Sequence, residues 1–152
     1  LDEATLTVRK RFGRGLFGDE GVCGMAVGGD ELYVGDITHR CIHVFSMSGE
    51  HLRDIRGDWR LPKKLLFVRD RLYMVERDEE YEEPGDETAE EKKERREAGK
   101  RIFVLTQRGE TLQKYRFDTW VQKMTILGDK LIVMNGVTAD VDAASLRALR
   151  GL

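Results

Sequence analysis

Cysteine is scarce in this 152-residue chain, which has two, Cys23 and Cys41. Two cysteines cannot form the disulfide framework of a small secreted domain, and their number favours a reducing compartment. We therefore expect an intracellular protein in which both thiols are small buried side chains. Long hydrophobic runs are also lacking, because no apolar stretch approaches the ~18 residues of a membrane-spanning helix. The chain starts at Leu1 rather than at methionine, so we expect an excerpt or a processed form of a longer protein.

Motifs for catalysis and cofactor binding are also missing. The sequence has no G-x-S-x-G nucleophile elbow and no G-K-[ST] phosphate loop. Cys41 lies between His39 and His43, and on a strand Cys41 and His43 share one face. A structural zinc site normally needs four ligands, and only Cys23 and His51 remain to complete one. We therefore predict no enzyme, no cofactor and no metal.

The charge is unevenly distributed. Residues 76–99 contain 12 acidic and 5 basic side chains, whereas the other 128 residues carry a net charge of +5. A mildly basic body thus has an acidic insertion at residues 77–99. Its Thr88–Glu91 pair forms a capping box for a helix that ends at Gly99 and has no apolar stripe, so we expect a charged, solvated helical insertion. An electrostatic contact with a basic partner is the alternative.

Three segments of the chain repeat one another without gaps: Gly24–Asp36, Lys64–Glu76 and Lys123–Asn135. Each has an apolar run, a turn containing aspartate and a second apolar run, as in a β-hairpin. In the first two repeats a second hairpin follows, with Gly49 and Gly109 at equivalent turns. Four short antiparallel strands in about 40 residues are the signature of a β-propeller blade.

The first blade, Gly24–Gly57, resembles one NHL repeat. Tyr33–Asp36 matches the second strand of that family, Ile42–Phe45 its third strand, and Ser48–Glu50 with Leu52 its fourth. Cys41 stands where the family usually has arginine, and the second blade keeps this arginine as Arg101. The resemblance implies an all-β fold of antiparallel four-stranded blades, and such propellers usually close with about six blades. It implies no particular activity.

The repeats are too few to close such a ring. We expect residues 1–19 to supply the last strand of a preceding blade and a linker, followed by a blade at 20–57, a blade with the insertion at 58–117, and half a blade at 118–136. The chain is then cut from a longer protein, completes a ring with another copy or another polypeptide, or docks as an open array on an assembly. Residues 137–152 follow helical spacing and predict a short C-terminal helix.

The second strands end in oxygen-bearing side chains at equivalent positions, Asp36, Glu76 and Asn135. Three oxygens at one rim could bind a hard cation, but we favour the interpretation that each caps the turn that follows it. RNA binding is a rival function, because some NHL propellers bind RNA. Its candidate residues are basic side chains near the first blade edge and around the next blade junction, with aromatic residues that could stack on bases: Arg9, Lys10, Arg11, Arg14, Arg53, Arg56, Arg60, Lys63, Lys64, Trp59, Tyr73 and Trp120.

The sequence therefore predicts a non-catalytic protein-interaction or scaffold element of the NHL-propeller type, in a larger assembly of other protein chains. An RNA-binding propeller and part of a metal-dependent propeller hydrolase or lyase are the alternatives. The expected partner contacts lie at the blade rim, in the insertion and at the second blade junction: Asp36, His39, Arg40, Lys63, Lys64, Glu79, Glu80, Glu82, Glu83 and Asn135.

Overall fold

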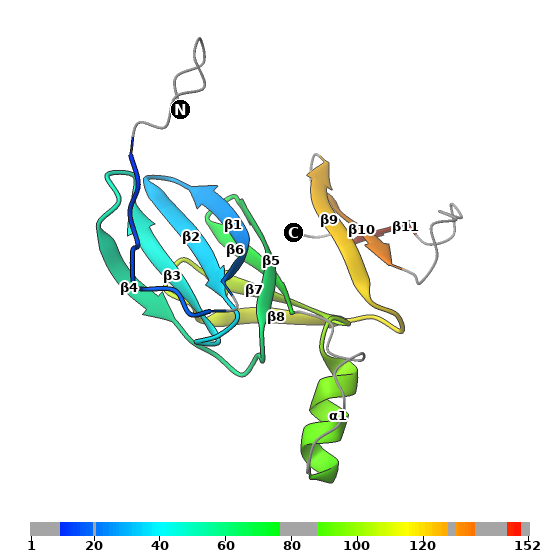
Figure 1. Ribbon diagram of the computed structural model, residues 1–152. Coiled ribbons are helices and arrows are strands. Elements are labelled where there is room, and N and C mark those ends of the chain that lie inside the picture. Colours follow the sequence, from blue (N-terminus) through cyan, green and yellow to red (C-terminus); the bar gives the residue numbers. More distant parts are fainter. Residues whose placement is uncertain (1–9, 20, 77–87, 128–129, 136–145, 150–152) are drawn as a thin grey trace.

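The computed structural model describes residues 10–19, 21–76, 88–127, 130–135 and 146–149. They form three antiparallel sheets that lie next to one another as blades (Figure 1). The innermost strands are neighbours, with β1 (Val22–Gly28) against β5 (Pro62–Val68) and β5 against β9 (Val121–Leu127). No helix in the described part of the chain is long and apolar enough to cross a membrane.

Blades one and two have the four-stranded order that the repeat predicts. In blade one β1 is followed by β2 (Glu31–Asp36), β3 (Cys41–Ser46) and β4 (His51–Ile55). In blade two β5 is followed by β6 (Arg71–Glu76), β7 (Arg101–Thr106) and β8 (Thr111–Arg116). The incomplete all-β propeller architecture is therefore confirmed.

Blade three differs from the prediction at its outer edge. β9 pairs with β10 (Lys130–Asn135), and β10 pairs with a third strand, β11 (Leu146–Leu149). The predicted C-terminal helix is therefore wrong for residues 146–149, and the half blade has three strands; residues 136–145 lie outside the described part. Pairing with β10 satisfies the backbone groups of an otherwise open sheet edge, which outweighs a short helical pattern.

The predicted hairpin turns of blades one and two are confirmed by their backbone conformation, whereas the turn predicted between β9 and β10 falls on residues 128–129, outside the described part of the chain. Arg69 and Asp70, between β5 and β6, both have positive φ, as the two central residues of a tight hairpin turn require. Gly49 and Gly109 occupy equivalent turns and have φ of 84° and 93°. Glycine adopts this left-handed conformation without steric cost, so it sets the register of the two outer hairpins.

Two apolar layers hold the blades together. The first lies between blades one and two and includes Tyr33, whose ring stacks on Phe67 at a centroid distance of 5.3 Å. The second lies between blades two and three and includes Tyr73 and Leu131. Blade two is therefore covered on both faces, whereas within the described residues blades one and three each have one face without a neighbouring blade.

The blades approach each other closely at Gly35 of β2. A Cβ atom at this position would lie 2.6 Å from the backbone oxygen of Pro62, well inside ordinary contact distance. Glycine is needed here because backbone rather than a flexible side chain faces it.

The insertion in blade two forms the helix α1 (Ala89–Glu97) before β7. The predicted capping box is confirmed: the backbone N–H of Glu91 donates to the Thr88 hydroxyl, and the Glu91 carboxylate accepts from the Thr88 backbone N–H. Gly99 follows with φ of 78°, as predicted for the residue that ends the helix. No residue of α1 is buried, so the helix projects from the rim of the blade (Figure 1).

The segment from residue 10 to residue 19 has no strand and lies along blade one. Phe12 and Phe17 place their rings 5.3 and 6.1 Å from the ring of Phe45 on β3. The strand expected near the N-terminus falls mainly on residues 1–9, which lie outside the described residues. The described segment covers part of the face of blade one that neither of the other two described sheets covers.

Candidate functional site

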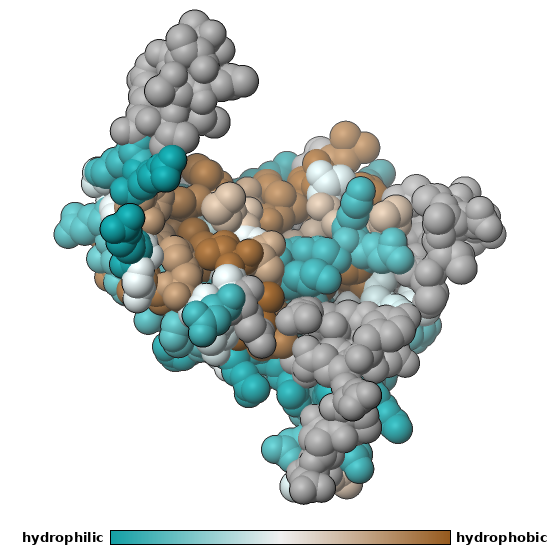
Figure 2. All heavy atoms as spheres, in the orientation of Figure 1, coloured by the Kyte–Doolittle hydropathy of each residue, from teal (hydrophilic) through white to brown (hydrophobic). Residues whose placement is uncertain are grey.

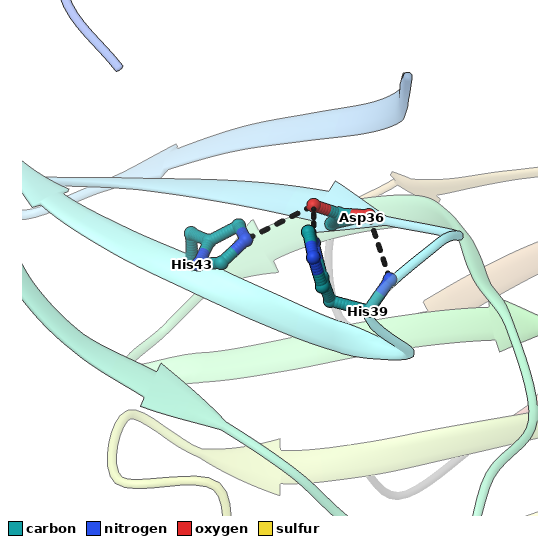
Figure 3. A group of neighbouring side chains, drawn as sticks. All are labelled: Asp36, His39 and His43. Atoms are coloured by element: carbon teal, nitrogen blue, oxygen red, sulfur yellow. Dashed lines mark hydrogen bonds and ion pairs between the residues drawn. The ribbon is translucent and has the colours of Figure 1, made fainter. Parts of the chain in front are cut away.

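Polar side chains gather where β2 leads into β3 in blade one. Asp36 is the last residue of β2 and is fully buried, while His43 projects from the middle of β3 and is almost completely buried. His39 lies in the turn between the two strands and is 47% exposed. The antiparallel pairing of β2 with β3 brings these three residues together although they span eight positions (Figure 3).

One oxygen of Asp36 contacts both histidines. Asp36 Oδ2 lies 2.8 Å from His39 Nδ1 and 3.1 Å from His43 Nε2. The other oxygen, Oδ1, accepts a hydrogen bond from the His39 backbone N–H at 3.0 Å. Asp36 therefore caps its turn, as predicted, but it also joins two imidazole rings (Figure 3).

The contacts continue to β4 through a second carboxylate. His43 Nδ1 lies 2.7 Å from Asp54 Oδ1, which also lies 2.8 Å from His51 Nε2. Asp54 faces His43 because the two residues are register partners of β3 and β4. All three histidines of the chain therefore belong to one alternating row of imidazoles and carboxylates across blade one.

The histidines stabilise the ionised forms of both carboxylates. Burial by itself would raise the pKa of Asp36 and Asp54, but the hydrogen bonds from the histidines outweigh it and hold each pKa below the ordinary value of 3.8. His43 can donate to both carboxylates at once only as an imidazolium, because neutral histidine has a single ring N–H. In this row the imidazole rings therefore stabilise the negative charges of the two carboxylates.

Cys41 begins β3 beside this row and is completely buried, and it does not form a disulfide with Cys23. Cys23 is half-buried, and its thiol donates to the backbone oxygen of Pro62 at 3.0 Å. Cys41 Sγ lies 3.6 Å from His43 Nε2. Burial, followed by the negative charge of Asp54, raises the pKa of the Cys41 thiol to about 11. Cys41 is therefore a neutral, weakly polar neighbour of the row at physiological pH.

Blade two has an arginine–glutamate pair at the equivalent place. Arg101 Nε and Nη2 donate to the two oxygens of Glu76 at 2.7 and 2.8 Å, and both side chains are buried. Glu76 Oε1 also accepts from the backbone N–H of Arg60, and Arg101 Nη1 contacts Glu94 of α1 at 3.1 Å. For Glu76 the structure therefore shows an arginine clamp in place of a simple turn cap.

A charged cleft lies between α1 and the rim of blades one and two. Its volume is about 510 Å³, and its lining includes Arg40, Arg60 and Arg101 on one side and Glu90, Glu91 and Glu94 on the helix. Arg40 is exposed, has a φ of 52° at the end of its turn and lines this cleft. Both signs of charge face the opening, which suits polar side chains of a protein better than a single anion or cation.

The two lysines at the second blade junction lie on β5. Lys64 Nζ donates to the backbone oxygen of Val121 at 2.7 Å, so this side chain connects blade two to blade three. Lys63 is half-buried beside it, and both line a small cavity of about 120 Å³ together with Glu76 and Trp120. Lys64 is thus positioned as a structural contact between blades.

The remaining predicted contact residues lie outside what the structure describes. This holds for Glu79, Glu80, Glu82 and Glu83 of the insertion and for the side chain of Asn135, whose backbone ends β10. The aromatic residues proposed to stack on RNA bases have clearer positions. Trp59 and Tyr73 are buried in the two layers between blades, and Trp120 is half-buried at the cavity beside Lys64.

Sequence reasoning missed Asp54 and His51 as members of the row in blade one. The register of β3 and β4 was the available signal, since it places position 54 opposite position 43 once Gly49 is assigned to the turn. It also missed that Glu76 and Arg101 form a pair, because 24 residues separate them in the chain.

Comparison with known proteins supports the fold alone. No family model matches the chain, and no curated protein matches it. Solved β-propeller structures are similar to it: BamB from Moraxella catarrhalis, with a TM-score of 0.52 and 12% identity over 75% of this chain, and U3-55K, with 0.53 and 18% over 76%. Kuenenia stuttgartiensis hydrazine synthase has a TM-score of 0.54 and 15% identity over 84%.

The chain spans only about a third of these structures, covering 30% of BamB, 31% of U3-55K and 37% of hydrazine synthase. The shared feature is therefore part of a propeller. One of the three is named as a synthase, so the fold by itself does not separate enzymes from binding proteins.

Proposed function

We propose that this chain is a non-catalytic protein-interaction or scaffold element of the NHL-propeller type, which acts within a larger assembly. The observation that carries the proposal is the pair of apolar blade faces that no other blade covers in the described part of the chain. Met25 and Val27 on β1 are 66% and 56% exposed, and Leu127 on β9 is 71% exposed. Figure 2 shows hydrophobic residues gathered over the region where Figure 1 places β1 and its neighbours.

The repeat indicates what covers these faces. In blade two Leu65 and Phe67 occupy the positions that Met25 and Val27 occupy in blade one, and both pack on the neighbouring blade. Likewise Val68, the equivalent of Leu127, packs on blade three. An apolar side chain that is a blade contact in one repeat is expected to be a blade contact in the next, so each open face fits another blade-like sheet.

A second copy of this chain is the first partner to test. Three blades from each of two copies amount to about six, the number with which NHL propellers usually close. Closure would remove both open faces and cover the edges of the array. Blades from another polypeptide, or a continuation of the same protein, would meet the same faces.

The polar groups at the rim support a non-catalytic role. The carboxylates of Asp36 and Glu76 are each held by partners from their own blade, His39 and His43 in one case and Arg101 in the other. RNA binding is less well supported, because two of the three aromatic side chains expected to stack on bases, Trp59 and Tyr73, are buried between blades. The charged cleft beside α1 offers a second protein-binding surface with mixed charge.

The proposal is tested by the mass of the protein in solution, measured by light scattering during gel filtration. We expect a multiple of the 17.5 kDa chain. Met25→Lys combined with Leu127→Lys should yield the monomer, because a lysine ammonium cannot be buried between blades without a partner. Met47→Lys is the matched control: Met47 is 61% exposed but lies in the turn between β3 and β4.

A photo-crosslinking amino acid at position 25 tests the wider form of the proposal. In an extract of the cells that naturally produce the protein, the labelled chain should crosslink to one defined protein, which is either a second copy of the chain or a partner with propeller blades. A chain that stays monomeric and gives no crosslink from position 25 would contradict the scaffold function.

A further inference from the structure

We propose that the junction between β2 and β3 in blade one binds one divalent transition-metal ion of the zinc class, with Asp36, His39 and His43 as ligands. Asp36 Oδ2, His39 Nδ1 and His43 Nε2 converge on one point and lie within 4.8 Å of one another. The carboxylate oxygen is 2.8 Å from one ring nitrogen and 3.1 Å from the other. Figure 3 shows both rings directed at the same carboxylate.

The donor set matches the chemistry of zinc. Imidazole nitrogen and carboxylate oxygen both bind Zn²⁺ at about 2.0–2.2 Å, and tetrahedral coordination then places neighbouring ligand atoms about 3.3 Å apart. The two separations between Asp36 Oδ2 and the ring nitrogens, 2.8 and 3.1 Å, are a few tenths of an ångström shorter, so the ion enters by a small outward movement of the exposed His39 ring and the loss of the shared protons. Three protein ligands leave one position for water.

Groups outside the ligand set hold His43 in the orientation that metal binding requires. Its second ring nitrogen, Nδ1, lies 2.7 Å from Asp54 Oδ1, and Asp54 is held in turn by His51. A metal-bound histidine typically donates its other N–H to a carboxylate, which fixes the ring and increases the basicity of the ligand. The Phe17 ring packs edge-on against His43 at 5.3 Å and restricts it further.

Blade two provides independent support, because it has a permanent cation at the equivalent position. The Arg101 guanidinium sits on the carboxylate of Glu76, while Phe103 replaces His43. Blade one has Cys41 in place of this arginine and has two imidazoles around the carboxylate instead. A bound metal ion would therefore supply in blade one the positive charge that a guanidinium supplies in blade two.

This site differs from what the sequence predicts and does not depend on the proposed scaffold function. The cysteines and histidines of the chain are by themselves too few for a structural zinc site with four such ligands. The fold adds a carboxylate to two of the histidines and leaves Cys41, whose thiol is neutral, beside them. Only one blade contributes ligands, so neither ring closure nor a partner protein is needed for binding.

Calorimetric titration of the chelator-treated chain with Zn²⁺ tests the proposal, together with the visible spectrum of the Co²⁺ form. We expect one ion per chain and cobalt d–d bands of a four- or five-coordinate site. His39→Gln, which changes an exposed turn residue, should weaken binding by at least about tenfold, because it removes a ligand. Glu50→Gln is the matched control and should keep affinity within about threefold, because Glu50 is an exposed residue of the turn between β3 and β4, at the other end of β3 from the proposed site.

His43→Gln gives a second test, and thermal unfolding shows whether each variant is folded. Saturating Zn²⁺ should raise the melting temperature of the unaltered chain and of Glu50→Gln more than that of His39→Gln, because stabilisation by a ligand increases with its affinity for the folded state. Absence of binding, or equal loss in His39→Gln and Glu50→Gln, would overturn the proposal. A cobalt spectrum dominated by thiolate charge transfer would also overturn it, since the ion would then be bound by a cysteine.

Discussion

Blades one and two are formed by the same repeat, yet different side chains surround the carboxylate at the junction between their second and third strands. In blade one Asp36 is surrounded by histidines, and His43 is paired across the strands with the anionic Asp54. In blade two Glu76 is clamped by Arg101. At the position of His43 blade two has Phe103, and the cationic Lys114 lies over its ring at 4.7 Å.

The difference shows which part of the junction the fold requires. Both blades end the second strand with a buried carboxylate and place donors around it, because an unpaired buried charge is costly. The identity of the donors varies: guanidinium is always charged, whereas imidazole titrates near physiological pH and can bind metals. Blade two thus has a guanidinium at its buried carboxylate, whereas blade one has two imidazoles there.

The largest expected effect comes from removing the clamp in blade two. Arg101→Ala leaves the buried Glu76 carboxylate without its charged partner, so we expect a loss of about 3–5 kcal/mol in the free energy of unfolding. Arg116→Ala is the matched control, because the Arg116–Glu97 pair lies on the same rim but is more exposed. It should cost about 1 kcal/mol or less in chemical denaturation. Equal effects of the two substitutions would contradict the role of burial.

A smaller effect is expected when blade one receives the aromatic residue of blade two. His43→Phe removes the shared donor of Asp36 and Asp54, and we expect a loss of about 1.5–3 kcal/mol at neutral pH. Denaturant midpoints of the variant and of the unaltered chain give the comparison. His51→Phe, which leaves the contacts of Asp36 intact, should cost less.

The same variant should change the response to acid. The pKa values of Asp36 and Asp54 are held below 3.8, so their contribution to stability is complete above that pH and is lost as the pH falls through the folded-state values. The unaltered chain should therefore lose more stability than His43→Phe between pH 5 and about pH 2. Parallel curves of unfolding free energy against pH would argue against the row as the cause.

The packing of blade one against blade two can be tested at Gly35. Blade two has Val75 at the equivalent position, but a Cβ atom at Gly35 would meet the backbone oxygen of Pro62 at 2.6 Å. Gly35→Ala should cost about 1–3 kcal/mol, because the backbone must move. Val75→Ala changes the equivalent position of blade two, where the structure already accommodates a side chain. Thermal melts of both variants show whether the two blades differ in the space available at this position.

The smallest effect concerns the helix that only blade two has. Thr88→Ala removes the N-cap of α1 and should destabilise that helix by about 1 kcal/mol. Since no residue of α1 is buried, amide exchange should accelerate within the helix while the melting temperature of the chain stays the same. A lower melting temperature would instead show that α1 supports the propeller.

Much of the fold is predictable because it is encoded locally. The alternation of apolar residues, the positive-φ turns and the capping box at Thr88 depend on neighbours in sequence, and the structure confirms each of them. The third strand of blade three was missed because Leu146–Leu149 is short and pairs with β10 across a long connection. Such pairing depends on an available sheet edge, which no local pattern records.

The candidate site was predictable only in part. Asp36, His39 and Arg40 stand within five residues and were recognised as a rim turn. The contribution of Asp54 depends on the register between β3 and β4, and the position of Arg40 at the cleft beside α1 depends on how the blades and the helix are arranged. Burial, which makes the contacts of Asp36 energetically important, exists only after the blades have packed.

The sequence by itself determined the blade repeat, the position of the insertion and the carboxylates that end β2 and β6. These features could be predicted because a period of about 40 residues and the turn residues are local properties of the chain. Tertiary structure alone decided what surrounds each carboxylate. Strand register set His43 between Asp36 and Asp54 and set Arg101 on Glu76, and burial made each contact a condition of stability. The physical reason is that charge pairing in a sheet follows distance across strands, which the order of residues along the chain does not record.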